Sequence, residues 1–568
     1  MLLALLAYRD ITSYGFVEDA DLLIAQNDYI KHLGNLWANV THDYFWSQAQ
    51  TGIPYWRPVT KGSWVLEYAL FRGWPGGFLL VQLAWFVLGV IGVQALALLC
   101  GATRPFAALA GVLFALHPVA IDPVCLIMAR SDVVSATCLL WSLWAYARAL
   151  RPREGSSPVP MLALHLLTLA LALGSKEQAV VIVPVLLLWA ALARVGAEPR
   201  PHLSPPATPL GNRPFLFLLP ALALVAVYLV ARRLVLHGMS QPAPVTDPLR
   251  VLVGASFYLK GLLPLRITSG VRNLSLSELR DPTTIATAAA LVLAVTAGAL
   301  YALRRRLFAV PLILAWIGAS VLPVLVIANL SVPYAAIKVP LADRWLLQGA
   351  AVSSVLYALC LERLRRQVVT RCFVGAVVLW AAATLALSSR SHGVYRTGVT
   401  LLDLEDRLLD ETPPQHRTPE DACLAVDRRV ARELAIGDAA MAVFIFQEMP
   451  THCELTGSRL FNHFSLLVGL KRYSEARPHL AKLLAGPLEG RYMGPAYYLG
   501  GVTLLNTGDP KEGEVLLRRA ERMGVAGRNC NVYVHLAHAA NLQGHPADEA
   551  AARAQAAACL AKKALTAP

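Results

Sequence analysis

Ten long apolar segments, separated by short polar gaps, dominate residues 77–388 of this 568-residue chain. Several approach the roughly 20 residues that an α-helix needs to cross the hydrocarbon of a bilayer, and some are shorter. Only 15% of the residues are charged, against about a quarter in a typical soluble domain. The sequence therefore predicts an all-α, polytopic membrane bundle. The apolar segments lie at 77–100, 105–118, 132–147, 160–174, 178–193, 214–231, 284–303, 307–329, 345–361 and 372–388.

Basic residues concentrate in alternate gaps between these segments. Lys and Arg outnumber Asp and Glu by 51 to 37, a formal net charge of +14. No basic face with interleaved aromatics is present, which argues against a nucleic-acid partner, whereas cytoplasmic loops of membrane proteins carry such an excess. The gaps expected to be cytoplasmic contain Arg104; Arg148, Arg151 and Arg153; Arg194, Arg200 and Arg213; Arg304, Arg305 and Arg306; Arg363, Arg365, Arg366 and Arg371.

If the basic gaps are cytoplasmic, the segments between them and an initial helix give about eleven spans. The N-terminus is then inside and everything after residue 388 is outside. The segment 251–265 then cannot be a simple span, and we interpret it as interfacial or re-entrant. The first span would start at MLLALLA, which is too short to cross alone. An upstream start, an incomplete span or a signal peptide are the alternatives, and the last lacks a basic n-region.

The predicted organisation has three parts. Residues 1–390 form a membrane domain whose long outside loop covers 9–76, and 391–455 form a helical linker. In 456–568, the segments LKRYSEARPHL, NTGDPKEGEVLL and LQGHPADEAAARA place Ala476, Gly513 and Ala550 at intervals of 37 residues. This spacing is close to that of tetratricopeptide hairpins, which offer a concave surface to a peptide, and an Ala-rich helical bundle is the alternative.

Four of the nine cysteines fall in the part expected outside, at Cys423, Cys453, Cys530 and Cys559. An oxidising compartment would permit disulfides, but the spacings match no metal motif and define no pairing. Buried, unpaired thiols are an equally good interpretation.

Ionisable residues cluster at the helix ends expected on the outside face. Because such residues at membrane depth indicate function, we treat them as candidate site residues. A carboxylate there could act as general base on an acceptor hydroxyl, while Arg and Lys stabilise a departing lipid phosphate. The carboxylates could instead hold a divalent cation such as Mg²⁺ or Mn²⁺, and interhelical ion pairing is the structural alternative. The candidates are Glu18, Asp19, Arg57, Lys61, His117, Arg130, Asp132, Lys176, Glu177, Lys338, Asp343 and Arg344.

An ordered series of segments over about residues 8–400 resembles a known family. FVEDADLLIAQNDYI, LWANVTHDYFW, YWRPVTKGSWVLEYALF, LHPVAIDPVCLIMARSD, GSKEQAVVIVPVLLLW, FYLKGLLPLRI and PLADRWLL are similar to blocks of the transmembrane and tetratricopeptide-repeat O-mannosyltransferases of the GT-C superfamily. The resemblance implies an inverting membrane enzyme that moves a sugar, typically mannose, from a polyprenyl phosphate to Ser or Thr hydroxyls of a protein. The repeats would bind the acceptor, and membrane lipids would surround the spans.

The resemblance also implies residue roles. Asp19 would be the general base with Glu18 in support, or both would bind the metal if one is required. Arg57, Arg130, Lys176 and Arg344 match basic positions expected to bind the donor phosphate. Further candidates are Lys61, Asp132, Glu177, Asp343 and His117, the last in an HP pair whose role could be structural.

Some features depart from the family pattern. The acidic pair is Glu-Asp where Asp-Asp is common, and ADRWLL lacks the second Tyr of the family block.

The Ala, Leu and Arg-rich composition suggests a bacterial inner-membrane protein with its site and repeats in the periplasm. Two other classes remain open, a non-enzymatic scaffold whose repeats recruit a partner and a transporter of lipid-linked sugars. The scaffold would tolerate Asp19→Asn, and the transporter would need charges deep inside its spans.

Overall fold

The computed structural model divides the chain into two compact units. Unit 1 comprises Met1–Tyr44 and Pro54–Glu405, and unit 2 lies mainly within Asp406–Pro568. The residues described are 2–17, 19–45, 55–152, 154–197, 210–236, 248–263, 271–275, 280–327, 338–365, 419–435, 438–449, 453, 457–486, 490–525 and 529–566.

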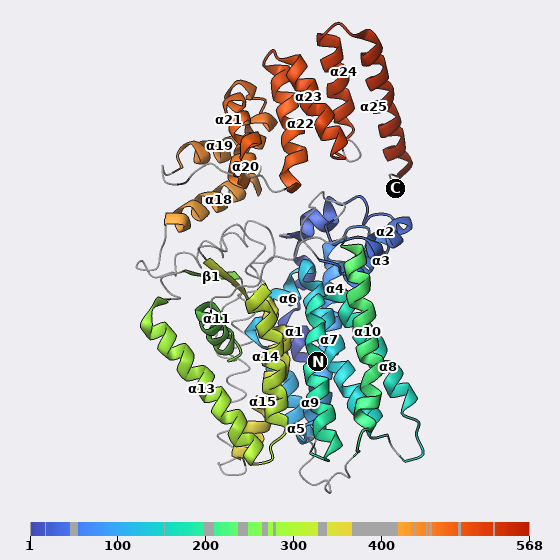
Figure 1. The fold of residues 1–568 in the computed structure, drawn as a ribbon, viewed down its shortest axis with the longest axis vertical. Coiled ribbons are helices and arrows are strands. Elements are labelled where there is room, and N and C mark those ends of the chain that lie inside the picture. Colours follow the sequence, from blue (N-terminus) through green and yellow to red (C-terminus); the bar gives the residue numbers. More distant parts are fainter. Residues whose placement is uncertain are drawn as a thin grey trace. The chain divides into compact units, whose positions relative to one another are not determined.

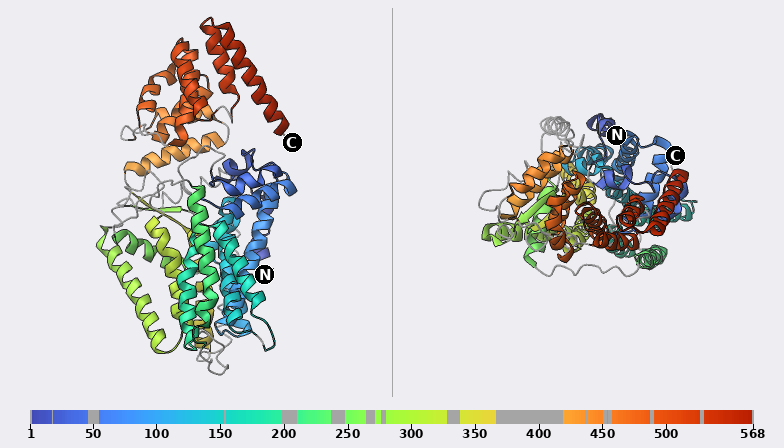
Figure 2. Two further views of the ribbon diagram at one scale, coloured as in Figure 1. Left: turned by 45° about the vertical axis from the view of Figure 1, so that its right-hand side comes forward. Right: turned by 90° about the horizontal axis from the view of Figure 1, so that it is seen from above.

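Unit 1 is built of helices, and Figures 1 and 2 show its long helices α4, α7, α9 and α10 running along a common direction. Its helices are α1 (Leu2–Ala7), α2 (Leu36–Thr41), α3 (Pro58–Phe71), α4 (Pro75–Leu99), α5 (Arg104–Ala115), α6 (Ile121–Cys125), α7 (Arg130–Leu150), α8 (Val159–Ser175), α9 (Ile182–Arg194), α10 (Arg213–Val235), α11 (Pro248–Gly261), α13 (Pro282–Arg304), α14 (Ala309–Ile327) and α15 (Leu347–Arg365). Short helical turns lie between them, at η1 (Ile11–Ser13), η2 (Asp21–Ala25), η3 (Leu33–Asn35), η5 (Pro118–Ala120), η6 (Ile127–Ala129), η7 (Glu177–Val181) and η10 (Asp343–Leu346).

The predicted helical membrane class is confirmed, with one departure. Strands β1 (Val271–Ser275) and β2 (Lys338–Ala342) form an antiparallel two-stranded sheet that an all-α prediction does not contain. The partners are more than 60 residues apart in the chain, and no local sequence signal announces such a pairing.

Six of the described helices are long and apolar enough to cross a membrane, or seven if one bent pair counts as a single span. Together they indicate a multi-pass integral membrane protein. The predicted count of about eleven stays a prediction, because segment 372–388 lies outside the described residues.

The bent pair shows why segment 105–118 is not one straight helix. Helix α5 ends at Ala115, and the chain turns by 54° before η5 and α6. Pro118 has no N–H to donate, and a proline disfavours helical geometry at the residue before it. His117 accordingly adopts an extended conformation, with φ −65° and ψ 128°.

Small residues let α4 and α7 approach closely in the centre of unit 1. A Cβ at Gly89 would lie 2.7 Å from the Thr137 hydroxyl, and one at Gly92 would lie 3.2 Å from Leu140. Thr137 Oγ1 donates to the Trp85 carbonyl at 3.0 Å. Close backbone approach with an added hydrogen bond is a common way for helices to associate in lipid.

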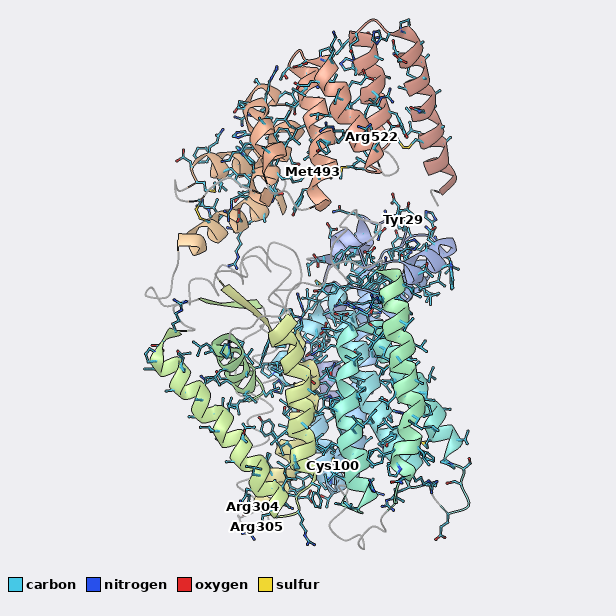
Figure 3. All side chains as sticks on the ribbon, viewed as in Figure 1. Tyr29, Cys100, Arg304, Arg305, Met493 and Arg522 are labelled. Carbon is cyan, nitrogen blue, oxygen red and sulfur yellow. A yellow bond between two sulfur atoms is a disulfide. The ribbon has the colours of Figure 1, made fainter. Side chains whose placement is uncertain are left out.

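The basic residues after α13 and the long N-terminal loop lie at opposite ends of unit 1. Figure 3 shows Arg304, Arg305 and Cys100 at one end and Tyr29 at the other. This separation agrees with the predicted alternation of sides, while the assignment of each side to a compartment remains a prediction.

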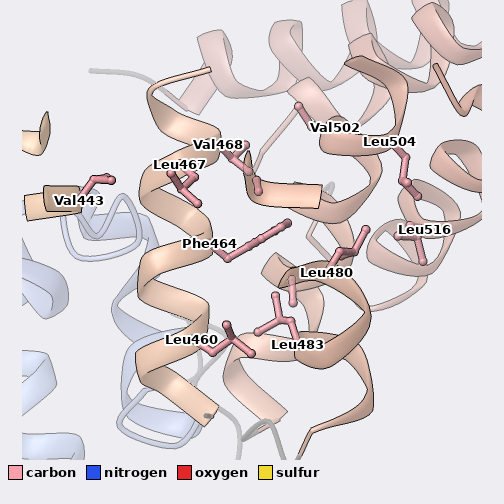
Figure 4. Close-up of a cluster of buried hydrophobic side chains, with 12 residues drawn as sticks. Val443, Leu460, Phe464, Leu467, Val468, Leu480, Leu483, Val502, Leu504 and Leu516 are labelled. Carbon is pink, nitrogen blue, oxygen red and sulfur yellow. The ribbon is translucent and has the colours of Figure 1, made fainter. Parts of the chain in front are cut away.

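Unit 2 is a series of helices in which each packs against its chain neighbour, and α20, α22 and α24 also contact one another in order. The helices are α18 (Pro419–Ala435), α19 (Ala439–Gln447), α20 (Gly457–Gly469), α21 (Tyr473–Ala485), α22 (Gly490–Asn506), α23 (Pro510–Arg522), α24 (Asn531–Leu542) and α25 (Pro546–Thr566). Figure 4 shows a core cluster built from Leu460, Phe464, Leu480, Leu504 and Leu516 with their neighbours.

The predicted 37-residue spacing marks equivalent places in successive hairpins. Ala476 and Gly513 lie in the first turn of α21 and α23 and are buried. A Cβ at Gly513 would lie 3.1 Å from the Gly501 carbonyl, so this position needs a small residue. Ala550 is exposed, and it lies in α25, the last helix of the chain. The repeat therefore keeps its period while the burial of its marker residue changes at the end.

Two disulfides settle the pairing that the sequence left open. Cys423 bonds Cys453, and Cys530 bonds Cys559, so the alternative of buried, unpaired thiols is wrong for these four. The first joins α18 to the segment before α20, and the second joins the start of α24 to α25.

Candidate functional site

Asp19 presents an exposed carboxylate at the end of a short, well-packed segment. Val17 and Ala20 on either side are buried, with 3% and 0% of their surface exposed. The Phe16 ring packs edge-on against Phe78 of α4 with centroids 5.5 Å apart. This packing fixes the backbone, so that Asp19 faces outward. Glu18, the predicted partner, lies outside the described residues.

Arg57 stands at the start of α3 and is held from several directions. Its Nη2 and Nε donate to the two carboxylate oxygens of Glu177, at 2.8 and 3.1 Å. The rings of Tyr44 and Tyr55 lie 5.1 and 4.6 Å from the guanidinium carbon. Burial lowers the pKa of Arg57, but Glu177, Tyr44 and Tyr55 together raise it by more, and the net shift is upward. Arg57 is therefore a permanently charged group in a fixed orientation.

A second ion pair lies beside the first. Lys176 Nζ donates to Asp132 Oδ1, and both side chains are almost completely buried. Ser131 links the two pairs, since its Oγ lies 3.4 Å from Arg57 Nη1 and 3.4 Å from Asp132 Oδ2. The predicted residues Arg57, Glu177, Asp132 and Lys176 thus come together, from the start of α3, the first turn of α7 and the edge of η7.

Tyr44 connects Asp19 to this cluster. Burial raises the pKa of the Tyr44 phenol, Arg57 lowers it, and the negative charges of Asp19 and Asp132 raise it further. Asp19, Arg57 and Asp132 therefore all lie within electrostatic reach of one phenol. The Tyr44 N–H donates to the Tyr55 carbonyl at 2.8 Å, which holds the two rings on the same guanidinium. Asp19 and Arg57 accordingly act with opposite sign on the pKa of the same phenol.

Lys61 lies one helical turn beyond Arg57 and is 1% exposed. Its Nζ donates to the Asp43 carbonyl at 3.2 Å. Burial lowers the pKa of Lys61 to about 7, against the opposing effect of Asp43. The contact ties α3 to Asp43, the residue before Tyr44. Lys61 therefore helps to hold the Tyr44 ring against Arg57.

Arg130 lies buried between three helices. Its side chain is 0% exposed and forms a two-pronged ion pair with Glu67. Its Nη2 also donates to the Phe78 carbonyl at 2.6 Å, and its Nε donates to Gln82 Oε1 at 3.0 Å. Gln82 in turn donates to the Pro123 carbonyl at 2.5 Å. Pro123 lies in α6, the short helix that precedes α7. These bonds use the N–H groups of Arg130 to join α3, α4 and α7, and its assignment to the donor phosphate stays a prediction.

His117 is structural in this arrangement. Its Nδ1 accepts the Val119 N–H at 3.2 Å, so Nε2 carries the proton that it donates to the Leu262 carbonyl at 3.0 Å. Arg344 lies in η10, which packs against η5 and α6, the turns that follow His117. The side chain of Asp343 lies outside the described residues.

Within the described ranges, no group of three or more His, Cys, Asp or Glu residues could hold a metal ion. The predicted ligand pair Glu18 and Asp19 stays a prediction, since Glu18 is not described.

Three contributors were missed from the sequence, namely Tyr44, Tyr55 and Ser131. A usable signal existed for each. Tyr44 and Tyr55 stand in the aromatic loop segments HDYFW and PYWRP, and Ser131 lies between two candidates in ARSD. Aromatic rings in such a loop can bind a cation as well as line a membrane interface.

No protein-family profile matches the chain. It is 30% identical over 190 residues to Protein O-mannosyl-transferase Tmtc2 of Drosophila melanogaster, covering 31% of this chain and 20% of that protein. It is 29% identical over 204 residues to Protein O-mannosyl-transferase Tmtc1 of the same organism, covering 34% and 23%. About a third of the chain is thus similar to these two proteins. The resemblance expected from the sequence blocks is thereby confirmed, although the matched region spans only about a fifth of each relative.

Solved structures similar to the chain include two from other organisms. An Archaeoglobus fulgidus oligosaccharyltransferase tethered with an acceptor peptide shares 15% identity with a TM-score of 0.40, over 73% of this chain and 57% of that one. ArnT from Cupriavidus metallidurans bound to undecaprenyl phosphate shares 12% with a TM-score of 0.38, over 91% and 78%.

Proposed function

We propose that the chain is a GT-C glycosyltransferase that transfers a sugar, expected to be mannose, from a polyprenyl phosphate to Ser or Thr hydroxyls of a protein outside the membrane. The single observation that carries the proposal is the Arg57 cation, which Glu177 fixes over the Tyr44 ring and whose phenol neighbour also responds to the exposed Asp19 carboxylate. The Tmtc-like sequence supports the same reaction class.

Asp19 is the group suited to remove a proton. Its carboxylate is exposed to an approaching acceptor, and its backbone is fixed by buried neighbours. As the acceptor oxygen attacks the anomeric carbon, Asp19 takes the hydroxyl proton, and the bond from that carbon to the phosphate oxygen breaks. The bonding electrons leave with the phosphate, and attack from the opposite face inverts the anomeric centre.

Arg57 is the group suited to stabilise the departing phosphate. Two of its nitrogens bind Glu177 at 2.8 and 3.1 Å, while Nη1 makes only a 3.4 Å contact with Ser131. Nη1 is therefore the nitrogen that can donate to a phosphate oxygen without breaking the ion pair with Glu177. Lys176, already bound to Asp132, adds a second positive charge behind it. Fixed cations of this kind need little reorganisation when negative charge develops.

The test compares sugar transfer by wild type, Asp19→Asn and Asp28→Asn in membranes supplied with polyprenyl-phosphate mannose and an acceptor protein. Asp28 is a matched control, because it is an exposed carboxylate in the same loop that pairs with Lys31 at 2.9 Å. Loss of a general base typically lowers the rate by about 10²–10⁴-fold. We expect that loss for Asp19→Asn and unchanged transfer for Asp28→Asn.

Equal transfer by wild type and Asp19→Asn would refute the assignment of Asp19. A chelator added to the same membranes separates the two roles given to the carboxylates, because an enzyme that needs a bound divalent cation stops and one that uses only a base continues. A panel of other polyprenyl-phosphate sugars tests the expected preference for mannose.

A further inference from the structure

Gln178 is a buried amide at the edge of the candidate site. It follows Glu177 directly in η7 and is 8% exposed. Its Nε2 donates to the Ser320 carbonyl of α14 at 2.5 Å, across 142 residues of chain. Burying an amide costs free energy unless the amide is hydrogen-bonded. The bond to Ser320 therefore offsets the burial of Gln178 and ties η7 to α14.

The acceptor on α14 lies where the backbone bonding of that helix is interrupted. Pro323 has no N–H to give to the Ala319 carbonyl, which directly precedes Ser320. Side chains of neighbouring helices can bond to the backbone near such prolines in a membrane. The Ser320 hydroxyl is directed elsewhere, since its Oγ donates to the Trp316 carbonyl at 2.9 Å. Gln178 therefore contacts the backbone of α14 and does not depend on the Ser320 side chain.

The turn that carries Glu177 is too short to fix that carboxylate by itself. η7 is a 3₁₀ turn of 5 residues, and Lys176 before it is extended, with φ −152° and ψ 133°. Hydrogen bonds in a 3₁₀ helix have poorer geometry than those of an α-helix, and consecutive side chains point about 120° apart. Glu177 thus faces Arg57 while Gln178 faces α14. The two contacts hold the turn from different sides.

The alignment of this turn matters because the bond between Glu177 and Arg57 is two-pronged. Both carboxylate oxygens accept from the guanidinium, at 2.8 and 3.1 Å, which requires the two planar groups to face one another. The Glu177 side chain is 28% exposed, so water competes for its oxygens if the turn rotates. A rotation of η7 would then release Arg57 from the orientation that leaves Nη1 to a phosphate.

We infer that Gln178 is a positioning residue, whose bond to the Ser320 carbonyl holds η7 so that Glu177 keeps Arg57 oriented toward the donor phosphate. The inference rests on the proposed function, because its effect is expected where Arg57 meets the lipid-linked donor. Gln178 acts through Glu177 and Arg57 and takes no proton or charge itself.

The test measures initial rates of sugar transfer by the full-length chain in lipid nanodiscs, over a range of polyprenyl-phosphate mannose concentrations. Gln178→Met keeps the length of the side chain and removes the donor. Gln178→Asn keeps an amide but shortens it by one methylene, and it is the milder change if loss of the amide prevents folding. Ser320→Ala is the matched control, because it removes a buried hydroxyl from α14 and leaves the carbonyl that Gln178 binds.

We expect the KM for the donor to rise about threefold to tenfold in both Gln178 variants, the effect of one lost hydrogen bond, and to stay unchanged in Ser320→Ala. Gln178→Met combined with Arg57→Lys should raise the KM no further than Arg57→Lys alone, because both changes act through one contact.

A lower kcat with an unchanged donor KM in both Gln178 variants would overturn the inference, since a merely structural residue alters only the amount of active protein. Fully additive effects of Gln178→Met and Arg57→Lys would also overturn it. Failure of the proposed function gives a different result, because the wild type itself would then transfer no sugar from any polyprenyl phosphate, and both ideas would fall. Transfer by the wild type with an unchanged KM in the variants refutes the positioning role alone.

Discussion

Variants of the buried ion pair between Arg130 and Glu67 can show whether Arg130 is structural or binds the substrate. Glu67→Leu would leave the Arg130 charge unpaired at a position that is 0% exposed. Breaking a buried ion pair from one side typically costs about 3–5 kcal/mol. Arg130→Met would also remove donors from the Phe78 carbonyl and Gln82 Oε1, each worth about 1–3 kcal/mol when left unsatisfied.

The double variant Glu67→Leu with Arg130→Met removes both charges together. Its loss of stability should be smaller than the sum of the two single losses, by a few kcal/mol, because neither charge remains buried alone. The assay is chemical unfolding of the purified chain in mixed micelles, with sugar transfer measured on the same samples. If Arg130 is structural, the double variant regains transfer together with stability.

Two results would refute this reasoning. Unchanged unfolding of both single variants would mean that the pair contributes nothing to the fold. Recovery of stability in the double variant without recovery of transfer would mean that Arg130 contacts the donor, as the sequence prediction had it.

The remaining predictions concern three further groups. Arg57→Lys should raise the KM for the lipid-linked donor, because a single ammonium cannot keep the two-pronged bond to a carboxylate and reach a phosphate, and Arg72→Lys is the exposed control in initial-rate measurements. Lys61 has a folded pKa of about 7 against the ordinary 10.5 of a lysine, so the unfolded chain binds more protons between these limits and stability should rise with pH there. Thermal unfolding from pH 7 to pH 10 should show that rise in wild type and a smaller one in Lys61→Met, and equal slopes would contradict the account. Replacing Cys530 and Cys559 by Ser should destabilise unit 2 by about 3–4 kcal/mol, from the loop entropy of a bond that spans 29 residues, and an unchanged unfolding midpoint would contradict that estimate.

The sequence predicted which residues share one end of the bundle better than it predicted their partners. Arg57, Glu177, Asp132 and Lys176 were expected on one face, and the structure joins them into two linked ion pairs. Their pairing depends on how three separate segments rotate against one another. Those rotations follow from packing, including the close contact of Gly174 with Val59, and no residue spacing encodes them.

Arg130 shows where more could have been read from the sequence. It stands two residues before Asp132 at the start of a helix, and residues so spaced do not point the same way. Either Arg130 or Asp132 therefore had to face away from the site. Which one faces the carboxylate of Glu67 could be known only once α3 and α4 were placed beside α7.

Other features had no local signal. The pairing of β1 with β2 joins segments far apart in the chain, and the disulfides join cysteines 30 and 29 residues apart. Long-range contacts of this kind are set by the fold as a whole. The break at Pro118, in contrast, follows from one residue and its predecessor.

The distribution of sulfur in the described residues has a practical consequence. Unit 2 holds its cysteines in disulfides, whereas Cys100, Cys125 and Cys138 are buried thiols and Cys360 is an exposed one. A recombinant host that keeps thiols reduced would yield unit 2 without its crosslinks. Alkylation of the intact chain before and after mild reduction, followed by mass spectrometry, would show how much of each preparation contains both disulfides. This can be done before any activity is measured.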